Sequence, residues 1–288
     1  MTALLVTLGI VALLYLGILY AVARFSVHPF RTPLFFSPGL IGVPQENVKV
    51  IGREGKQLSA WWLPNPEAKT VIILAHGYMM NMSEPSAVAA KLNERGYACL
   101  LFDFPGHGRS PNAVVTLGLR EAEDVAGAVA LAREKMPHAK VVVWGSSMGA
   151  AATVLASPNL KLDGMVLDSV YAELLQAAQG WWLFLGGKTL QFFMRPTLIF
   201  ARVLAKVRLK DGRVTEALKK TDCPVLLMHG DADTMVPLAE AERNQRARAG
   251  IDLHVYHGCN HAEGRWVHSG QYYADLYEWL ERHGFTAR

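Results

Sequence analysis

Cysteine is scarce in this sequence. Among its 288 residues only Cys99, Cys223 and Cys259 occur, an odd number without regular spacing. Such a set gives no disulfide framework and no metal-binding signature. Cys99 and Cys223 lie in or beside apolar runs, so we expect reduced and mostly buried thiols. The chain also lacks internal repeats and low-complexity segments, and its length suits one large α/β domain or two small ones.

Concentrated charge of one sign is missing too. The formal net charge is +4, and the 29 Lys and Arg residues are scattered rather than gathered into one run, so a nucleic-acid partner is not expected. The glycine-rich stretch DFPGHGRSP, Asp103–Pro111, could be read as a phosphate-cradling loop. It matches neither G-x-x-x-x-G-K-[ST] nor G-x-G-x-x-G. We therefore interpret it as a turn at a strand end, with His107 and Arg109 bracing the rim of a site.

Charge is absent altogether from Thr2 to Ala23, TALLVTLGIVALLYLGILYAVA. As a helix this stretch is long enough to cross the ~30 Å hydrocarbon core of a bilayer. A cleaved signal peptide is the alternative, because small residues near its end fit a cleavage site. However, the apolar run exceeds the ~7–15 residues of a usual signal peptide, and no basic residue stands before it. We therefore interpret residues 1–24 as an uncleaved transmembrane anchor.

Positive charges follow this anchor at Arg24, Arg31 and Lys49. By the positive-inside bias, their position favours a cytoplasmic location for the rest of the chain. Prolines recur at short intervals within residues 25–45, which predicts an extended linker. This linker would join the anchor to a domain formed by residues 46–288.

The domain begins with a hairpin pattern over residues 47–65 and continues with apolar runs that alternate with helical patterns. Strands that are apolar throughout and separated by helices predict a mostly parallel sheet covered by helices on both faces. The leading hairpin would add antiparallel strands at one edge. Because ligands bind beyond the carboxyl ends of parallel strands, the residues just after each strand are the candidate site. The predicted strands of the alternating part cover residues 70–76, 97–106, 140–147, 162–169, 223–230 and 251–258.

The run VVVWGSSMGAA places Ser147 between Gly145 and Gly149, at a predicted strand-to-helix turn. This is the pattern G-x-S-x-G in the context that a nucleophile elbow requires. Side chains larger than glycine at 145 and 149 would collide with the neighbouring strand and helix. The strained turn would lift the Ser147 hydroxyl to the helix N-terminus, where partial positive charge favours a developing anion. Ser147 is therefore the predicted nucleophile, and an ordinary glycine-rich turn is the alternative.

A serine nucleophile needs a base and an orienting acid, in the chain order serine, acid, histidine. The stretch HGDADTMVP follows a later predicted strand and offers Asp231 and Asp233. Asp231 directly follows the turn glycine and is expected to shape the turn, so Asp233 is the predicted acid. Asp168, after the preceding strand, is a lesser alternative.

For the base, the loop YHGCNHAEG after the last predicted strand offers His261. His257 stands at the strand end and His268 at the start of the final helix, so both suit the role less well. An oxyanion hole needs backbone N–H donors. The expected donors are Met148, directly after the nucleophile, and Tyr78, in the loop LAHGYMMN after an early strand.

Five stretches occur in order along the chain: AHGY, DFPGHGRS, GSSMGA, HGDADTMVP and GCNH. Through them the chain resembles the α/β-hydrolase superfamily over roughly residues 48–284. Within it, the sequence is similar to the serine-aminopeptidase-like and monoglyceride-lipase-like branch, which includes membrane-anchored members. The resemblance implies an α/β-hydrolase fold, a Ser147–Asp233–His261 triad, an oxyanion hole at Tyr78 and Met148, and no metal or organic cofactor.

Residues 169–221 interrupt the alternating pattern with a segment too long for an ordinary connection, which predicts a helical cap over the strand ends. Its aromatic residues could form an apolar substrate surface or the core of the cap itself. Its basic residues could contact anionic headgroups or form a solvated helix face. The aromatic residues are Trp181, Trp182, Phe184, Phe192, Phe193 and Phe200, and the basic ones are Arg202, Lys206, Arg208, Lys210 and Arg213.

Together with the anchor, the apolar cap favours a serine hydrolase that cleaves an acyl ester or lipid, as a carboxylesterase or lipase does. A peptidase, an amidase or a thioesterase could use the same triad. A peptidase would need a carboxylate to hold an amino terminus, and the cap carries no acid between Glu173 and Asp211. A non-catalytic binding protein is a further alternative, although such proteins usually lose a triad member and all three candidates are present here.

Overall fold

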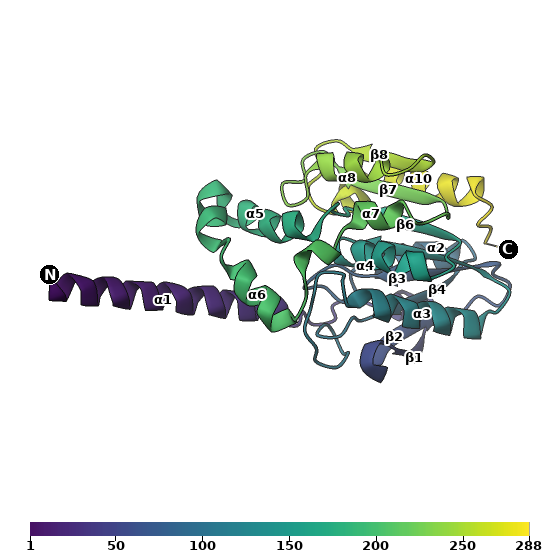
Figure 1. Ribbon diagram of the computed structural model, residues 1–288. Helices are drawn as coiled ribbons and strands as arrows, with labels where there is room; N and C mark the ends of the chain where they lie inside the picture. The colour runs from purple at the N-terminus through teal and green to yellow at the C-terminus, as the bar shows by residue number, and fades with distance from the viewer. Residues whose placement is uncertain (288) are drawn as a thin grey trace.

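The computed structural model describes residues 1–287. Its centre is an eight-stranded sheet with the order β1-β2-β4-β3-β5-β6-β7-β8 (Figure 1). β2 pairs in antiparallel fashion with β1 and β4, whereas the other neighbours are parallel. This confirms the predicted mostly parallel sheet with a hairpin at one edge. The strands are β1 (Glu46–Ile51), β2 (Gln57–Leu63), β3 (Thr70–Ala75), β4 (Ala98–Phe102), β5 (Lys140–Ser146), β6 (Gly164–Asp168), β7 (Val225–Gly230) and β8 (Ile251–Tyr256).

Helices cover both faces of the sheet. Successive strand residues point to opposite faces, so Ile73 and Val143 pack under α3 and α4, whereas Ile72 and Val142 pack under α2 and α10. Burial on both faces explains why the strands are continuous apolar runs in the sequence. The helices of this body are α2 (Ser86–Glu94), α3 (Glu121–Lys135), α4 (Met148–Ala156), α7 (Val214–Leu218), α8 (Leu238–Gln245), α9 (Gly264–Val267) and α10 (Ser269–Arg282).

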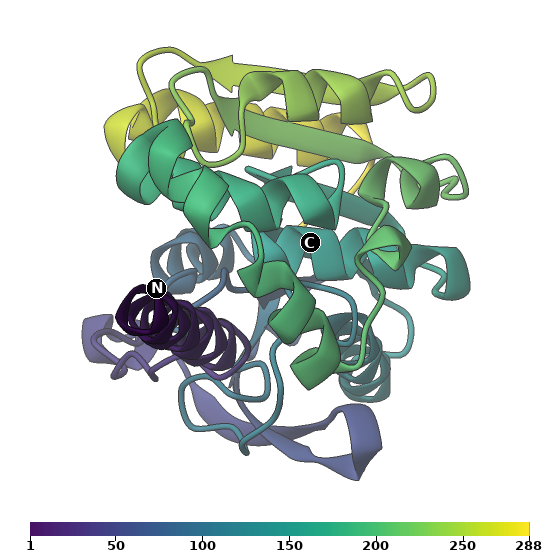
Figure 2. The same cartoon turned by 60° about the vertical axis from the view of Figure 1, so that its left-hand side comes forward.

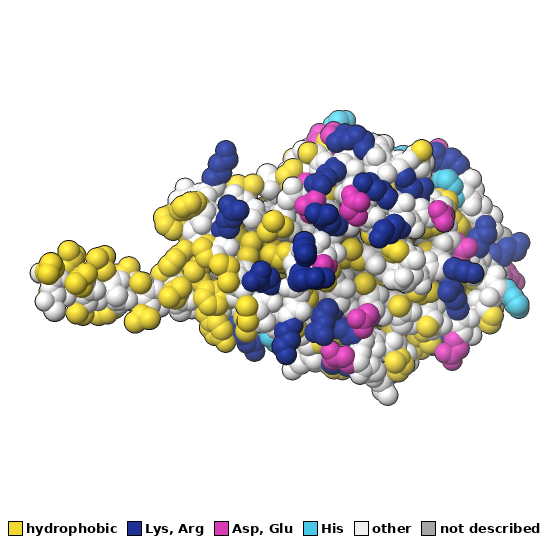
Figure 3. Space-filling model, viewed as in Figure 1, with side chains coloured by type: hydrophobic (Ala, Val, Ile, Leu, Met, Phe, Trp, Pro, Cys, Tyr) yellow, Lys and Arg dark blue, Asp and Glu magenta, His cyan; other side chains and the backbone are white. Residues whose placement is uncertain are grey.

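Three helices extend from one side of this body: α1 (Thr2–Val27), α5 (Leu174–Met194) and α6 (Thr197–Ala205) (Figures 1 and 2). We call α5 and α6 the cap. α1 packs along α6, with Tyr20 edge-on to Phe200 at 6.2 Å between ring centroids. Hydrophobic side chains gather over α1 and the adjoining cap, while charged side chains are spread over the body (Figure 3).

The boundaries of these helices differ from the predicted ones. α1 continues to Val27, into the segment predicted as a linker, because its last turn packs on the body. Ala23 and Val27 are buried there, and the Val115 N–H donates to the Val27 carbonyl oxygen at 2.9 Å. The helix ends just before Pro29, since the residue before a proline disfavours helical backbone angles. Within residues 169–221, α5 and α6 leave the body, whereas α7 packs against α4 as part of it.

The cap folds back on itself. α5 breaks at Gly186 and Gly187, and Gly187 has a φ of 67°, a left-handed conformation that glycine adopts without steric cost. The Gln191 side chain then donates to the Gln179 carbonyl oxygen at 3.2 Å, so the last turns of α5 lie beside its first half. Pro196, which cannot continue a helix interior, separates α5 from α6.

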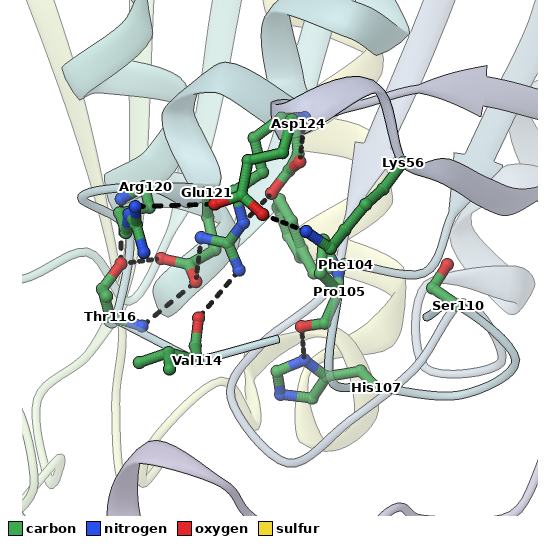
Figure 4. A network of polar contacts seen from close by, with 12 residues as sticks. Lys56, Phe104, Pro105, His107, Ser110, Val114, Thr116, Arg120, Glu121 and Asp124 are labelled. Carbon is green, nitrogen blue, oxygen red and sulfur yellow. Dashed lines mark hydrogen bonds and ion pairs between the residues drawn. The ribbon is translucent and has the colours of Figure 1, made fainter. Parts of the chain in front are cut away.

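A buried ionic network ties the hairpin to α3 (Figure 4). The Arg53 guanidinium lies 3.2 Å from Glu121 Oε1 and 3.6 Å from Asp124 Oδ2, and it donates to the Val114 carbonyl oxygen at 2.8 Å. Glu121 also accepts hydrogen bonds from the backbone N–H and the hydroxyl of Thr116. Burial raises the pKa of Asp124 to about 7. Thr116 lines a cavity that lies above the strand ends and is described below. This network therefore positions one wall of that cavity.

Candidate active site

A cavity of about 590 Å³ lies at the carboxyl ends of the central strands, between the sheet and the cap. Its volume is typical of small-molecule sites. The wall is mostly apolar and combines the last turn of α1, the loop after β3, the cap and the loop after β8. Phe25, Tyr78, Trp181 and His261 represent these contributions, and Val115 adds one from the segment between β4 and α3. The part played by α1 was missed by the sequence analysis, which treated the residues after the anchor as a linker.

Ser147 stands at the turn between β5 and α4. Its backbone angles are φ 50° and ψ −110°, a strained combination for any residue other than glycine. A Cβ at Gly145 would come within 2.5 Å of the Ala150 nitrogen, and one at Gly149 within 2.2 Å of the Ala75 carbonyl oxygen. Glycine at both positions therefore permits the close approach of strand and helix that holds Ser147 in this conformation.

The loops after β7 and β8 bring an acid and a base to Ser147. His261 Nε2 lies 2.9 Å from Ser147 Oγ, and His261 Nδ1 lies 2.6 Å from Asp233 Oδ2. The other oxygen of the buried Asp233 carboxylate accepts the backbone N–H groups of Met235 and Val236 at 2.9 and 2.8 Å. A carboxylate fixed in this way favours the imidazole tautomer with its proton on Nδ1. Nε2 is then left to accept the serine proton.

A second histidine–aspartate pair lies in the same two loops. His257 Nδ1 lies 2.8 Å from Asp231 Oδ2, and the Gly258 N–H donates to Asp231 Oδ1 at 2.7 Å. The His257 side chain is 88% exposed, and neither His257 nor Asp231 belongs to the cavity wall. This pair therefore shapes the turn after β8, and the cavity receives His261 and Asp233 instead.

Asp168, the alternative acid, belongs to a buried network of its own. Its carboxylate accepts the Tyr272 hydroxyl at 2.9 Å and lies 3.4 Å from Arg265 Nη1. Burial raises the pKa of Asp168, and the Arg265 charge opposes this effect. Arg265 also pairs with Glu84, whose other carboxylate oxygen accepts the Gly77 N–H at 3.1 Å. The network therefore positions the loop after β3, and none of the sequence motifs points to Glu84 or Arg265 as supporting residues.

The two backbone donors predicted for an oxyanion hole flank Ser147. Within residues 1–287, neither the Tyr78 N–H nor the Met148 N–H donates to a protein acceptor. A Cβ on Gly77 would lie 3.7 Å from the Ser147 Cβ, so the chain just before Tyr78 adjoins the serine. The Tyr78 hydroxyl donates to the Ser26 carbonyl oxygen of α1 at 2.9 Å. Tyr78 therefore links the surroundings of Ser147 to α1.

Two further histidines near this loop are buried. His76 Nε2 accepts the Phe104 N–H at 3.0 Å, and His107 Nε2 accepts the Met79 N–H at 3.3 Å. Burial lowers the pKa of both imidazoles, so both are neutral braces for the loops after β3 and β4. Across the described part of the chain, no group of three or more His, Cys, Asp or Glu side chains could hold a metal ion.

Comparison with known sequences identifies a protein family whose profile matches most of this chain. The sequence profile of the Alpha/beta hydrolase family matches residues 72–276, which leaves α1 outside the match. The chain is 26% identical to the monoacylglycerol lipase of Mycolicibacterium smegmatis over 236 residues, which cover 69% of this chain and 84% of that protein. It is 25% identical to the uncharacterized protein YfhR of Escherichia coli (strain K12) over 232 residues, which cover 78% of this chain and 75% of YfhR.

Comparison with solved structures gives the fold. The chain is similar to the Pyrococcus furiosus esterase Pf2001, with a TM-score of 0.74 at 25% sequence identity over 89% of this chain and 98% of the esterase. It is also similar to the Paleococcus ferrophilus monoacylglycerol lipase, with a TM-score of 0.60 at 18% identity over 79% of this chain and 99% of the lipase. The sheet and its covering helices are therefore an architecture that solved enzymes share.

Proposed function

Since the chain belongs to the alpha/beta hydrolase family, we propose that it is a serine hydrolase that cleaves carboxylic esters. Ser147 is the nucleophile, His261 the general base, and Asp233 the residue that orients the base. One observation carries the proposal: a continuous series of contacts runs from Asp233 through His261 to Ser147, with separations of 2.6 and 2.9 Å. This arrangement meets the geometric requirement for proton transfer from serine.

In the first half-reaction, Ser147 Oγ attacks the ester carbonyl carbon while His261 Nε2 takes the hydroxyl proton. The N–H groups of Met148 and Tyr78 donate to the oxyanion that forms. In a studied serine hydrolase, loss of one such donor slows the reaction roughly 10²–10³-fold. Asp233 stabilises the imidazolium on its Nδ1 side. The intermediate then collapses, the C–O bond to the alcohol breaks, and the alcohol leaves with the proton from His261 Nε2.

In the second half-reaction, water attacks the acyl group on Ser147. His261 Nε2 takes a proton from the water as its oxygen bonds to the acyl carbon, and the same two N–H groups bind the new oxyanion. Collapse breaks the bond to Ser147 Oγ, which regains its proton from His261. The carboxylic acid is released and the enzyme is restored.

An acyl ester with an apolar chain is the proposed substrate class. The mostly apolar cavity wall suits such a chain, and two similar proteins are named as an esterase and a monoacylglycerol lipase. The cap has no Asp or Glu between Glu173 and Asp211, so it offers no carboxylate to hold the amino terminus of a peptide. These observations favour an ester or lipid over a peptide.

We propose further that α1 anchors the enzyme in a membrane and that the body lies in the cytoplasm. α1 has 26 residues and is long and apolar enough to cross a bilayer, and Arg24, Arg31 and Lys49 follow it. The full chain should stay in the membrane pellet after alkaline carbonate extraction. Protease added outside intact cells should leave the body whole. Release by carbonate would argue against the anchor, and digestion of the body would reverse the orientation.

Active-site labelling of the full chain in detergent micelles tests the triad. A fluorophosphonate probe should label the native chain and leave Ser147→Ala unlabelled. Asp233→Asn should slow labelling by about 10³-fold or more, because the imidazole loses its orienting carboxylate. Asp231→Asn is the matched control, since it changes the second pair in the same loops, and it should label at the native rate. Persistent labelling of Ser147→Ala, or equal losses in the two Asn variants, would contradict the assignment.

A further inference from the structure

The free length of α1 is too short for a membrane span. Every residue of Met1–Leu14 is exposed, whereas Leu19 is buried in the part of the chain where α1 packs along α6. At about 1.5 Å per residue, the exposed stretch covers about 20 Å. The hydrocarbon core is about 30 Å thick and needs about 20 residues. A complete span therefore has to include the turns of α1 from Tyr15 onward, and these turns contact the cap.

These contacts place part of the cap at the level of the membrane surface. The Tyr15 hydroxyl donates to the Phe193 carbonyl oxygen at 2.5 Å, and Tyr20 packs on Phe200. Along α5 and α6, large hydrophobic side chains face outward, with Phe192 74% exposed. This apolar surface is continuous with α1 (Figure 3). The outward-facing set is Leu175, Phe184, Leu185, Phe192, Phe193, Ile199 and Val203.

We propose that the cap inserts this face into the bilayer interface beside α1, so that α1 and the cap form one membrane-embedded unit. Insertion to a depth of about 5–10 Å is usual for apolar faces of interfacial helices. Charge favours lipid over a second copy of the chain. The cap exposes Lys188, Arg195 and Arg202 and has no acid between Glu173 and Asp211. Basic side chains attract anionic headgroups, whereas pairing two identical faces would bring like charges together.

A groove between α1 and the cap leads from this face to the catalytic cavity. Leu198, Arg202 and Leu209 line both the groove and the cavity that holds Ser147. The groove is therefore the route by which an acyl ester passes sideways out of the bilayer to Ser147. This route rests on the proposed ester hydrolysis at Ser147, whereas insertion of the cap rests only on the proposed membrane anchoring by α1. The groove is lined on its α1 side by Leu8, Val11, Ala12 and Tyr15, and on its cap side by residues that include Phe192, Pro196 and Ile199.

Insertion is tested with the full chain in vesicles of phosphatidylcholine and phosphatidylglycerol. A fluorophore is attached at Phe192→Cys or Val203→Cys in a Cys223→Ser background, since the other two cysteines are buried. Ile51→Cys is the control, because Ile51 is 57% exposed on edge strand β1. Lipids with spin-labelled acyl chains should quench the fluorophore at 192 and 203 and spare it at 51.

Equal quenching at the three positions, in vesicles that retain the chain through carbonate extraction, would overturn the insertion while leaving the anchor in place. Cross-linking between copies through position 192, with no lipid quenching, would assign the face to a second copy and also overturn it.

Hydrolysis assays then test the route. Leu185→Glu combined with Val203→Glu should slow hydrolysis of a vesicle-borne long-chain monoacyl ester about tenfold or more, because the charges oppose insertion. Neither residue lines the cavity or the groove, so hydrolysis of a soluble short-chain ester should stay at the native rate. Ala12→Trp should narrow the groove and obstruct the path of the long-chain ester to Ser147. We expect the ratio of the long-chain to the short-chain rate to fall about fivefold.

Unchanged rate ratios in both variants would overturn the sideways route. If the native chain shows no Ser147-dependent hydrolysis at all, the proposed function fails, and the quenching result still decides insertion.

Discussion

The catalytic edge of the sheet and the unit formed by α1 and the cap are built in opposite ways. At the catalytic edge, Asp233, His261 and Ser147 are buried or half-buried and contact one another: Asp233 is 4% exposed and accepts three hydrogen bonds, from His261 and two backbone N–H groups. In the cap, large apolar side chains such as Phe192 and Val203 face outward. The proposed catalytic groups therefore contact one another within the folded chain, whereas the outward-facing apolar side chains of the cap are exposed in the described residues.

This difference separates two kinds of substitution. A change at the catalytic edge should affect every substrate equally, because it alters the reacting groups. A change on the outer face of the cap should affect only substrates delivered from a membrane. Substitutions in the two regions can therefore be told apart by the substrates they affect, and the largest effects are expected at the catalytic edge.

Ser147→Ala gives the largest expected effect. It removes the proposed nucleophile, and loss of the serine in a comparable triad lowers kcat about 10⁶-fold. The loss should be the same for a soluble short-chain ester and for a vesicle-borne long-chain ester, measured by release of the acid. A loss confined to one of the two substrates would break the separation between chemistry and delivery.

Asp233→Asn should have the next largest effect. The change leaves the shape of the loop intact but favours the wrong imidazole tautomer, and the equivalent change in another triad costs about 10⁴-fold in kcat. Asp231→Asn alters the exposed pair with His257 and should leave kcat at the native value. Measuring kcat for both variants on one soluble ester tests whether Asp233, and not Asp231, orients His261. A large loss in Asp231→Asn would show that the second pair takes part in the reaction.

The catalytic edge lay within reach of sequence reasoning for a physical reason. Ser147 directly follows β5, Asp233 and His261 lie in the loops after β7 and β8, and parallel strands bring their carboxyl ends to one edge of a sheet. The parallel sheet and the hydrolase family were both predicted and are confirmed. The structure brings the three side chains into contact, and their catalytic role stays a prediction until it is measured.

The supporting contacts were beyond reach because they depend on tertiary approach. Glu84 and Arg265 stand 181 positions apart in the chain, and neither lies in a motif or a periodic pattern. The last turn of α1 is a similar case. Its Phe25 lines the cavity, yet a sequence window sees only an apolar helix running into prolines. The packing of α6 determines which face of such a helix is buried. Local composition does not reveal that face or the residues it contacts.

Asp124→Asn should have a smaller effect, on stability and its pH dependence. The pKa of Asp124 rises from 3.8 to about 7 on folding, mainly through burial, although Arg53 lowers it; Glu121 and Glu123 raise it further. Between these two values the unfolded chain releases a proton that the folded chain keeps. The free energy of unfolding therefore falls as the pH rises through this window. The native chain should lose up to about 4 kcal/mol across it.

An asparagine at this position does not titrate, and its Oδ1 can still accept the Arg53 N–H that Asp124 accepts at 2.9 Å. The stability of the native chain relative to Asp124→Asn should therefore fall from pH 5 to pH 8, as measured by thermal unfolding in detergent micelles. This effect distinguishes the body from the cap, because the cap, without an acid between Glu173 and Asp211, has no buried carboxyl group of this kind. Parallel curves for the two chains would contradict the assignment.

The smallest effect is expected at Tyr78, the residue where the two regions meet. Its backbone N–H is assigned to the oxyanion, while its hydroxyl donates to the Ser26 carbonyl oxygen of α1 at 2.9 Å. Tyr78→Phe removes only the second contact. Because one hydrogen bond contributes about 1 kcal/mol, the melting temperature should fall slightly while kcat/KM on a soluble short-chain ester stays within about twofold. A loss of about 10²-fold or more would mean that the phenol, rather than the backbone N–H, stabilises the transition state. The Tyr78 side chain would then contact α1 and also take part in the reaction, so the catalytic edge and the unit formed by α1 and the cap would share a reacting group.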